Sequence, residues 1–576
     1  MAGDIYWGFV AVVSATVGLL TVLPEIYAWL KAPSRWTPVN SPPYMLGDDY
    51  HYFAQLNDIH RKCLNFFYGT RLSTRPLTAL FGFQLAGYFF NLLPYHIGFL
   101  LGDRRLGVLV VRVWNRSLLG LATAVFAKGF FLLIGVTPTT GLLILVFLVF
   151  FIFFPGPFEL GGADSIVMQM ENSRHIYDRS NANDLTRGMF SETTAPLLLS
   201  ACAVLTLVID VRHGMVVGIL GLFCLAVLFF HYFPAAVVFA WLLFLIFLVK
   251  HYFLLAFACG LLTIGLSCFS MHMLSRSDIG KELFVQNAGT AIFSFRRSSF
   301  IGVAFTLCLA LLLVFSLPVT PQTSVLVLYL GSVFFLAGLF FVKHQAIRFW
   351  SRGAVIPFEV MSTVVLATIA LPLLTEGFIS VFILVCFGIL VRYYYRQAFF
   401  LYHVGATLLA DGIEFDRDIC PRDAGRFPAR SRLVATNSTA LADCICVFSA
   451  DETYLRNYSI QSVGYRGQVR FFCANFKVLG ISFAECERWL AMSVEYKDWL
   501  FARPFQKQTP FAELCYAHTL QYMVSNREYN QALLRDGMHD GTGWTPKYRD
   551  FLRETWGTVD LSMMGDVVGV VVERPY

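Results

Sequence analysis

The sequence predicts a polytopic α-helical membrane protein with about eleven spans and a small C-terminal α/β domain. Of its 576 residues, 57% are hydrophobic and only 14% are charged, whereas soluble domains average about 25% charged residues. Apolar runs of about 20 residues, the length that crosses the hydrocarbon of a bilayer, recur up to about residue 410. Beyond that point Gly, Asp, Arg and Pro become frequent. We therefore expect a multi-span domain over residues 1–410 and a soluble domain over 411–576.

The expected spans follow the apolar runs, with boundaries good to a few residues. The first run has neither a basic stretch before it nor a small-residue cleavage site after it, so it is interpreted as a span rather than a removed signal peptide. The eleven predicted spans are 5–30, 106–128, 130–155, 194–211, 214–232, 234–249, 251–272, 300–317, 323–342, 357–373 and 375–391.

The stretch 79–101 decides the topology. It is apolar enough to be a twelfth span, but it contains Pro94 and a polar pair, Tyr95 and His96, which suit an interfacial or re-entrant segment. With twelve spans the C-terminal domain is cytoplasmic, and the basic residues near the spans then follow the positive-inside rule. With eleven spans the C-terminal domain lies on the outer side.

Short β-branched and aromatic stretches after residue 410 predict strands, and 3.6-residue periodicity predicts helices between them. Strands are expected within 432–448, 468–478 and 566–574, and helices over 482–501 and 510–534. This mixture of elements is typical of a small α/β domain packed on the helical part.

The polar segment 31–78 carries two adjacent carboxylates, Asp48 and Asp49, next to Tyr50, His51 and Tyr52. Loop acids near membranes are common, and a solvated loop is the plain interpretation. The sharper hypothesis is a general base that removes a proton from an acceptor hydroxyl, beside rings on which a sugar can pack. In an extended or loop conformation neighbouring side chains diverge, so only one carboxylate can serve. Asp49 adjoins the aromatic run and is the preferred base.

Later polar segments supply the cations that a departing phosphate needs, since guanidinium groups bind phosphate oxygens through paired hydrogen bonds. The alternative for each cluster is contact with lipid headgroups. The candidate residues are Arg174, His175, Arg179 and Arg187, then Arg296 and Arg297, then His344, Gln345, Arg348 and Arg352.

The order of these features resembles the GT-C superfamily of membrane glycosyltransferases, in a bacterial branch without an assigned activity. The matching features are one span, a loop with the acid pair of "GDDY", an apolar stretch, and a span that opens with "VVRVWNRSLLG". The segment "HQAIRFWSRGAVIPFEV" is similar to an outer-face motif of such proteins, although Glu359 stands where a histidine or aromatic residue is expected.

The resemblance implies a glycosyltransferase that uses a polyprenyl-phosphate sugar donor on the outer face of the membrane. It places the catalytic acid at Asp48 or Asp49 within an outer loop, 31–105. It also places the arginine that commonly opens the second span of such proteins at Arg112 or Arg116. It favours eleven spans, because the acids and the basic clusters then share one face. The implied location is the bacterial inner membrane, with a glycan, lipid or protein as acceptor.

A transporter or flippase for a lipid-linked glycan or another anion is the alternative function. That function predicts charges within spans, whereas apart from Arg112, Asn115 and Arg116 we expect no buried charge in the predicted spans. The chain contains no nucleotide-binding or metalloprotease motif, and its net charge of +6 gives no reason to expect nucleic acid. No organic cofactor is expected. Because carboxylate oxygens bind divalent cations, a cation at the acid pair stays open.

Overall fold

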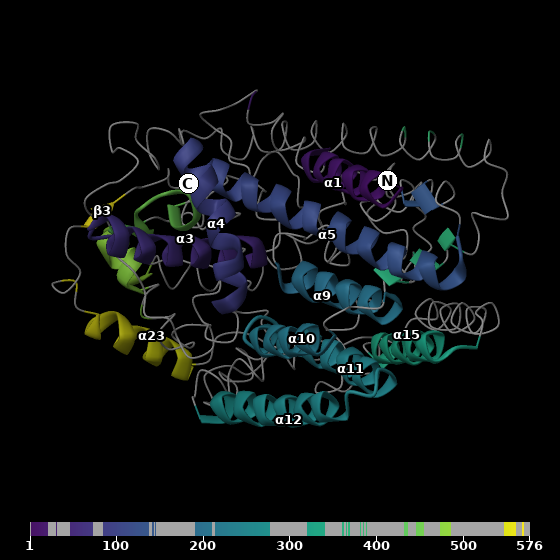
Figure 1. The fold of residues 1–576 in the computed structure, drawn as a ribbon. Helices are drawn as coiled ribbons and strands as arrows, with labels where there is room; N and C mark the ends of the chain where they lie inside the picture. Colours follow the sequence, from purple (N-terminus) through teal and green to yellow (C-terminus); the bar gives the residue numbers. More distant parts are fainter. Residues whose placement is uncertain are drawn as a thin grey trace.

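The computed structural model describes residues 2–20, 47–72, 85–136, 191–209, 214–276 and 319–339, and scattered positions over 141–145 and 360–388. In the C-terminal part it describes short stretches within 431–484 and 546–569. These residues are mostly helical (Figure 1). The predicted domain boundary near residue 410 lies outside the described residues.

Helix α5, Arg104–Ile134, is the longest helix of the described part and has a cap at each end. The Asp103 side chain accepts hydrogen bonds from the backbone N–H groups of Arg105 and Leu106, which satisfies donors that a helix N-terminus leaves open. Gly135 ends the helix with φ 71°, a conformation that glycine adopts without strain. Helices α1 (Ala2–Leu20), α4 (Leu85–Leu101) and α9 (Ser191–Val208) pack against α5.

The corner between α4 and α5 requires glycine. A Cβ atom on Gly98 would lie 2.6 Å from the backbone oxygen of Leu106, and one on Gly107 would lie 2.9 Å from that of Tyr95. The two backbones therefore touch, and Figure 1 shows α4 crossing beside the start of α5.

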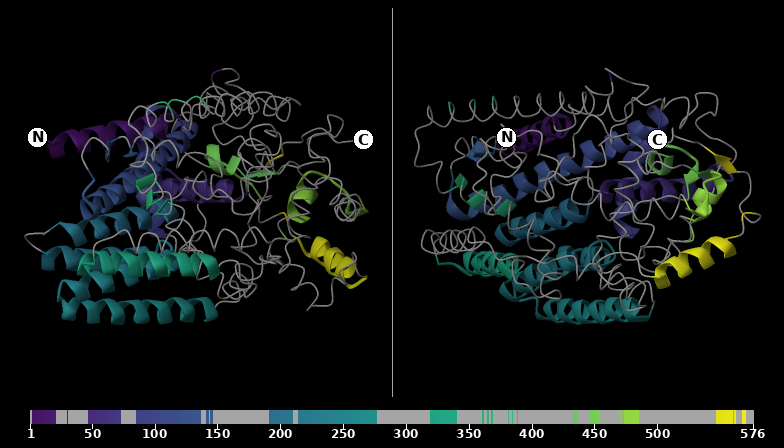
Figure 2. Two further views of the ribbon diagram at one scale, coloured as in Figure 1. Left: turned by 90° about the vertical axis from the view of Figure 1, so that its right-hand side faces the viewer. Right: turned by 180° about the vertical axis from the view of Figure 1, so that it is seen from behind.

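The remaining apolar helices stack beneath α9, as Figures 1 and 2 show. They are α10 (Gly214–Phe229), α11 (Phe233–Val249), α12 (Phe253–Arg276) and α15 (Pro321–Leu339). Helix α11 lies between α10 and α12 and buries most of its residues, including Phe239, Leu242 and Phe247. An α-helix that is apolar all round is expected in such an interior position.

The prediction of about eleven spans is wrong. Among the residues that the structure describes, only α5 is long and apolar enough to cross a membrane, and 67% of its apolar window is buried inside the protein. Among the described residues, the apolar segments within the other helices cover only 10–17 residues. Such a segment is about 26 Å long at most, short of the roughly 30 Å hydrocarbon core. Tight turns at residues 230–232 and 250–252 divide a nearly continuous apolar sequence into these shorter helices.

The C-terminal residues form a three-stranded parallel sheet in the order β2-β1-β3. The strands are β1 (Leu433–Ala435), β2 (Glu452–Thr453) and β3 (Val567–Gly569), and helix α23 (Pro546–Thr558) precedes β3. These elements lie at the same end of the molecule as helix α3, Gly47–Tyr68 (Figures 1 and 2).

The strand predictions have mixed outcomes. Within 432–448, residues 433–435 form β1 as predicted, whereas residues 445–448 are helical, and the predicted strand 468–478 is wrong at residues 473–478, which are helical. Both stretches are largely buried, and a short apolar run does not distinguish a buried helix from a buried strand. Most of the predicted helix 482–501, and all of 510–534, lie outside the described residues.

Candidate functional site

The acid pair begins helix α3 instead of occupying a loop. Asp48 and Asp49 fall in the first turn of α3, while the side chains of residues 47–52, including Tyr50, His51 and Tyr52, lie outside the described residues. The expected extended conformation is therefore wrong at these positions. In a helix, successive residues are separated by about 100° around the axis, so the two acids still occupy different faces.

The buried face of α3 can be followed from its described residues. Phe53, Leu56, Asn57 and His60 are at most 1% exposed, and we call these four residues the packed stripe. Asp49 precedes Phe53 by four residues and Leu56 by seven, which puts it in the register of the packed stripe. Asp48 instead shares its register with the half-buried Gln55 and Lys62 and with the buried Ile59.

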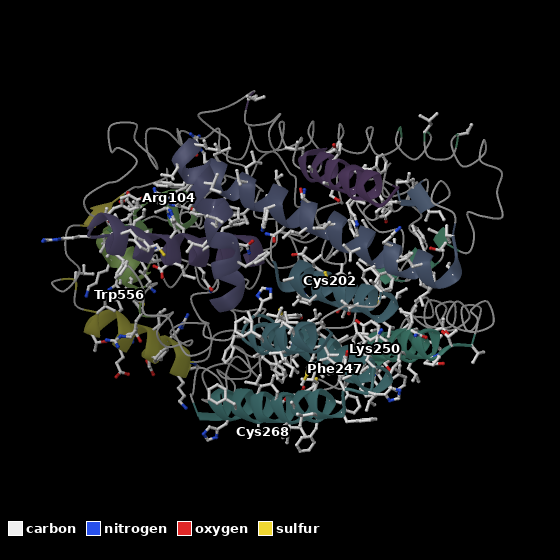
Figure 3. All side chains as sticks on the ribbon, viewed as in Figure 1. Arg104, Cys202, Phe247, Lys250, Cys268 and Trp556 are labelled. Atoms are coloured by element: carbon white, nitrogen blue, oxygen red, sulfur yellow. The ribbon has the colours of Figure 1, made fainter. Side chains whose placement is uncertain are left out.

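Asn57, in the packed stripe, joins four parts of the protein. Its Nδ2 donates to the carbonyls of Cys446 (2.8 Å) and Ser449 (2.9 Å), and its Oδ1 accepts from the Tyr95 hydroxyl (3.3 Å) and from Arg104 Nε (3.0 Å). Figure 3 labels Arg104 at this end of the molecule. An amide group has two donors and two acceptor lone pairs, so this side chain is fully hydrogen-bonded.

Residues 445–451, which we call the docking segment, end their helical turn against α3. Arg61 Nη1 donates to the carbonyls of Ala450 and Asp451, both at 3.2 Å, and Arg61 Nη2 lies 3.4 Å from Asp58 Oδ1. The other oxygen of Asp58 pairs with Lys62 at 3.2 Å. A guanidinium at the carbonyl end of a helical turn is electrostatically favourable. The docking segment leads directly into β2, so α3 holds the amino end of that strand.

A histidine pair connects α3 with α4. His60 Nε2 lies 2.9 Å from His96 Nδ1, and the His60 ring contacts Tyr95 and Phe99 edge-on, with ring centroids 5.0 and 4.8 Å apart. Burial, with the positive charges of Arg104, His96 and Arg61, lowers the pKa of His60 to about 3. His60 is therefore neutral at physiological pH, and one ring nitrogen of the pair donates to the other.

This neutral histidine makes the stability of the α3–α4 contact depend on pH. The pKa of His60 is about 3 in the folded protein and about 6.5 in the unfolded chain. The contribution of neutral His60 to the free energy of unfolding is complete above pH 6.5. It is lost as pH falls toward 3, because the unfolded chain then binds a proton that the folded protein excludes. Between pH 7 and pH 5 we expect a loss of about 2 kcal/mol. Thermal unfolding of the protein and of His60→Asn at both pH values measures this loss of stability. An equal loss in the two proteins would contradict the assignment of the pH dependence to His60.

A second polar cluster lies deeper, between α4, α5 and α9. Asn115 Nδ2 donates to Asn91 Oδ1 at 2.9 Å, and the hydroxyl of Thr194 lies 3.5 Å from Asn115 Oδ1. Arg112 and Arg116 flank Asn115 on α5 and are 2% and 9% exposed. Arg112, predicted to bind substrate, is thus an interior residue of α5, the one helix among the described residues that is long and apolar enough to cross a membrane.

The other predicted binding residues cannot be placed relative to α3, since they fall outside the described residues: Arg174, His175, Arg179, Arg187, Arg296, Arg297, His344, Gln345, Arg348 and Arg352. The described residues contain no group of three or more potential metal ligands from His, Cys, Asp and Glu. The described cysteines of the C-terminal part, Cys446 and Cys473, are buried and form no disulfide.

Sequence reasoning missed the roles of Asn57, Arg61 and His60. Asn57, His60 and Arg61 follow the acid pair at helical spacing, and that spacing was the available signal. Their distant partners, 36 to 392 residues away, leave no local trace in the sequence. No protein family, no curated protein and no solved structure matches this chain.

Proposed function

We propose that this protein is a membrane-associated glycosyltransferase that moves a sugar from a polyprenyl-phosphate donor to an acceptor hydroxyl. The observation that carries the proposal is the register of α3. It puts Asp49, and not its neighbour Asp48, in line with the packed stripe of a helix that two other helices and the docking segment hold in place. A base works well when rigid elements support it.

The chemistry follows from a carboxylate beside an activated sugar. The Asp49 carboxylate takes the proton of the acceptor hydroxyl, and the acceptor oxygen forms a bond to the anomeric carbon. The bond between that carbon and the phosphate oxygen breaks, and its electron pair leaves on the polyprenyl phosphate. The developing charge on that phosphate requires a cation, and arginine is suited to it by its paired donors.

Exposed apolar stripes support an association with membrane lipids. On α4, Phe90, Leu93, Ile97 and Leu100 are exposed at helical spacing, opposite the buried Asn91, Tyr95 and Phe99. Exposed apolar faces of this kind are typical of surfaces that contact a membrane or another protein. Helices α10 and α12 expose further apolar side chains, among them Met215, Ile219, Phe223, Leu254, Phe257, Leu261 and Ile264. We place the site on the outer face of a bacterial inner membrane.

Direct transfer tests the proposal. Purified full-length protein in lipid nanodiscs is incubated with polyprenyl-phosphate-linked sugars and with candidate glycan or lipid acceptors. Release of polyprenyl phosphate, with the sugar recovered on an acceptor or on water, is the expected result. If no donor of this class is consumed or bound, the proposed function is wrong.

The donor phosphate provides a second test. Arg352→Gln is expected to weaken donor binding by about 1.5–3 kcal/mol, the contribution of hydrogen bonds to a charged group, and Arg352→Lys by less because it keeps the charge. Arg105→Gln is the matched control, since Arg105 Nε is already paired with Asp103 at 2.7 Å. Equal donor affinity in Arg352→Gln and in the unaltered protein would make Arg352 a headgroup contact.

A transporter or flippase of an anionic lipid-linked substrate is the second candidate, and one observation favours it. Arg112 and Arg116 are buried on the helix that could cross a membrane, and ionisable residues at such positions often mark a substrate path. The two candidates differ over Asp49, because transport requires no general base.

A further inference from the structure

We propose that Asn57 is the positioning residue of this enzyme, and that through it the docking segment fixes the orientation of α3 and therefore of Asp49. The inference rests on the proposed function and extends it, because it makes a C-terminal segment part of the machinery that aims the base. It predicts that loosening a contact far from the acid pair in sequence slows the reaction without weakening substrate binding.

The geometry of the Asn57 amide carries the argument. The amide oxygen receives only donors, from Tyr95 on α4 and Arg104 on α5, while the amide nitrogen meets only carbonyls of the docking segment. The four contacts approach from different elements and use every hydrogen-bonding position of the group. Rotation of α3 about its axis would break all of them together, so this side chain fixes the helix in one rotational setting.

Asn57 and Asp49 belong to one continuous helix, α3. Eight residues separate them, which is slightly more than two helical turns and leaves them about 80° apart around the axis. A rigid helix transmits a rotation at Asn57 directly to its first turn. Arg61, one turn further on, adds two bonds to the docking segment in the same direction.

Substituting aspartate for Asn57 isolates the contribution of the docking segment. Asn57→Asp keeps the shape and both acceptor contacts to Tyr95 and Arg104. It places a carboxylate oxygen against the carbonyls of Cys446 and Ser449, so that only the docking segment is repelled. Arg61→Lys is a milder second variant, because a single ammonium group has no fork with which to bind two carbonyls in the same way.

Asn65 supplies the matched control on the same helix. Its Nδ2 donates to the Leu72 carbonyl at 2.8 Å, and its Oδ1 accepts from the Thr70 hydroxyl at 2.7 Å and the Leu72 N–H at 2.8 Å. These bonds remain within the turn that follows α3. Asn65→Asp therefore removes amide donation from the same helix while it leaves the hydrogen bonds to the docking segment in place.

Two measurements on the full chain in nanodiscs test the inference: amide hydrogen exchange over residues 51–56, and the kinetics of transfer from a polyprenyl-phosphate sugar. For Asn57→Asp we expect exchange about tenfold faster, as opening becomes easier when hydrogen bonds are lost. We expect kcat about 10²-fold lower, the effect of a misplaced reacting group, with KM within about threefold. Arg61→Lys should change the exchange rate and kcat in the same direction but by less. Asn65→Asp should change neither the exchange rate nor kcat. Unchanged exchange in α9 and α11 shows that the variants are folded.

Unchanged exchange over residues 51–56 in Asn57→Asp, or faster exchange with an unchanged kcat, overturns the inference. Equal slowing by Asn65→Asp also overturns it, since the effect would then belong to α3 in general. Failure of the proposed function is recognised separately. If Asp49→Asn transfers sugar as fast as the unaltered protein, Asp49 is not the base, whereas a slow Asp49→Asn beside a fast Asn57→Asp removes only the positioning role.

Discussion

Asp49→Asn is expected to lower turnover with a polyprenyl-phosphate sugar by a factor of about 10²–10⁴, the usual contribution of a general base. Asparagine keeps the shape of the side chain and its hydrogen-bonding capacity but cannot accept the proton. Because the loss concerns the chemical step, donor affinity should stay unchanged. Turnover is measured as release of polyprenyl phosphate, and donor affinity by equilibrium binding to the same nanodisc preparation.

Two controls accompany this variant. Asp48→Asn lies one residue away, outside the register of the packed stripe, and should lower turnover much less. Asp550→Asn removes an exposed carboxylate of α23 whose ion pair with Arg553 is long, 3.9 Å. It should leave both turnover and donor affinity unchanged. If both Asp48→Asn and Asp49→Asn turn over at the original rate, the pair has no catalytic role and the transporter becomes the better candidate.

The sequence predicted where the apolar helices begin better than it predicted whether lipid or protein surrounds them. Helices α9, α10, α11, α12 and α15 begin within three residues of the predicted positions 194, 214, 234, 251 and 323. Their assignment as spans was wrong, because hydropathy measures the transfer of a segment out of water and does not say whether lipid or protein receives it. In α11 the recipient is largely protein, since Phe239, Leu242 and Phe247 are buried against its neighbours.

The candidate site shows the same limit. The acid pair and its aromatic neighbours are a local pattern, and so a sequence can reveal them. Asn57 is an ordinary polar residue in that pattern, and its importance comes from carbonyls 389 and 392 residues further along the chain. Backbone carbonyls carry no residue-type signal, so no motif could have predicted that the docking segment would be bound there.

The packing of α3 should be as sensitive to substitution as its polar contacts. Phe53→Ala is expected to lower the free energy of opening of α3 by about 3–5 kcal/mol, the usual loss when a buried aromatic side chain is truncated to a methyl group. The Phe53 side chain is 0% exposed, and it lies one turn after Asp49 in the packed stripe. Amide hydrogen exchange of the slowest residues in α3 measures this free energy directly.

Phe66→Ala is the matched control for that prediction, because it makes the same substitution on the same helix. Phe66 is 83% exposed, so its truncation should change the opening free energy by no more than about 0.5 kcal/mol. The contrast between the two phenylalanines tests the rotational setting of α3 without reference to any substrate. Equal losses at Phe53 and Phe66 would mean that α3 does not pack through the Phe53 face, and Asp49 would then lose the register on which its role as base depends.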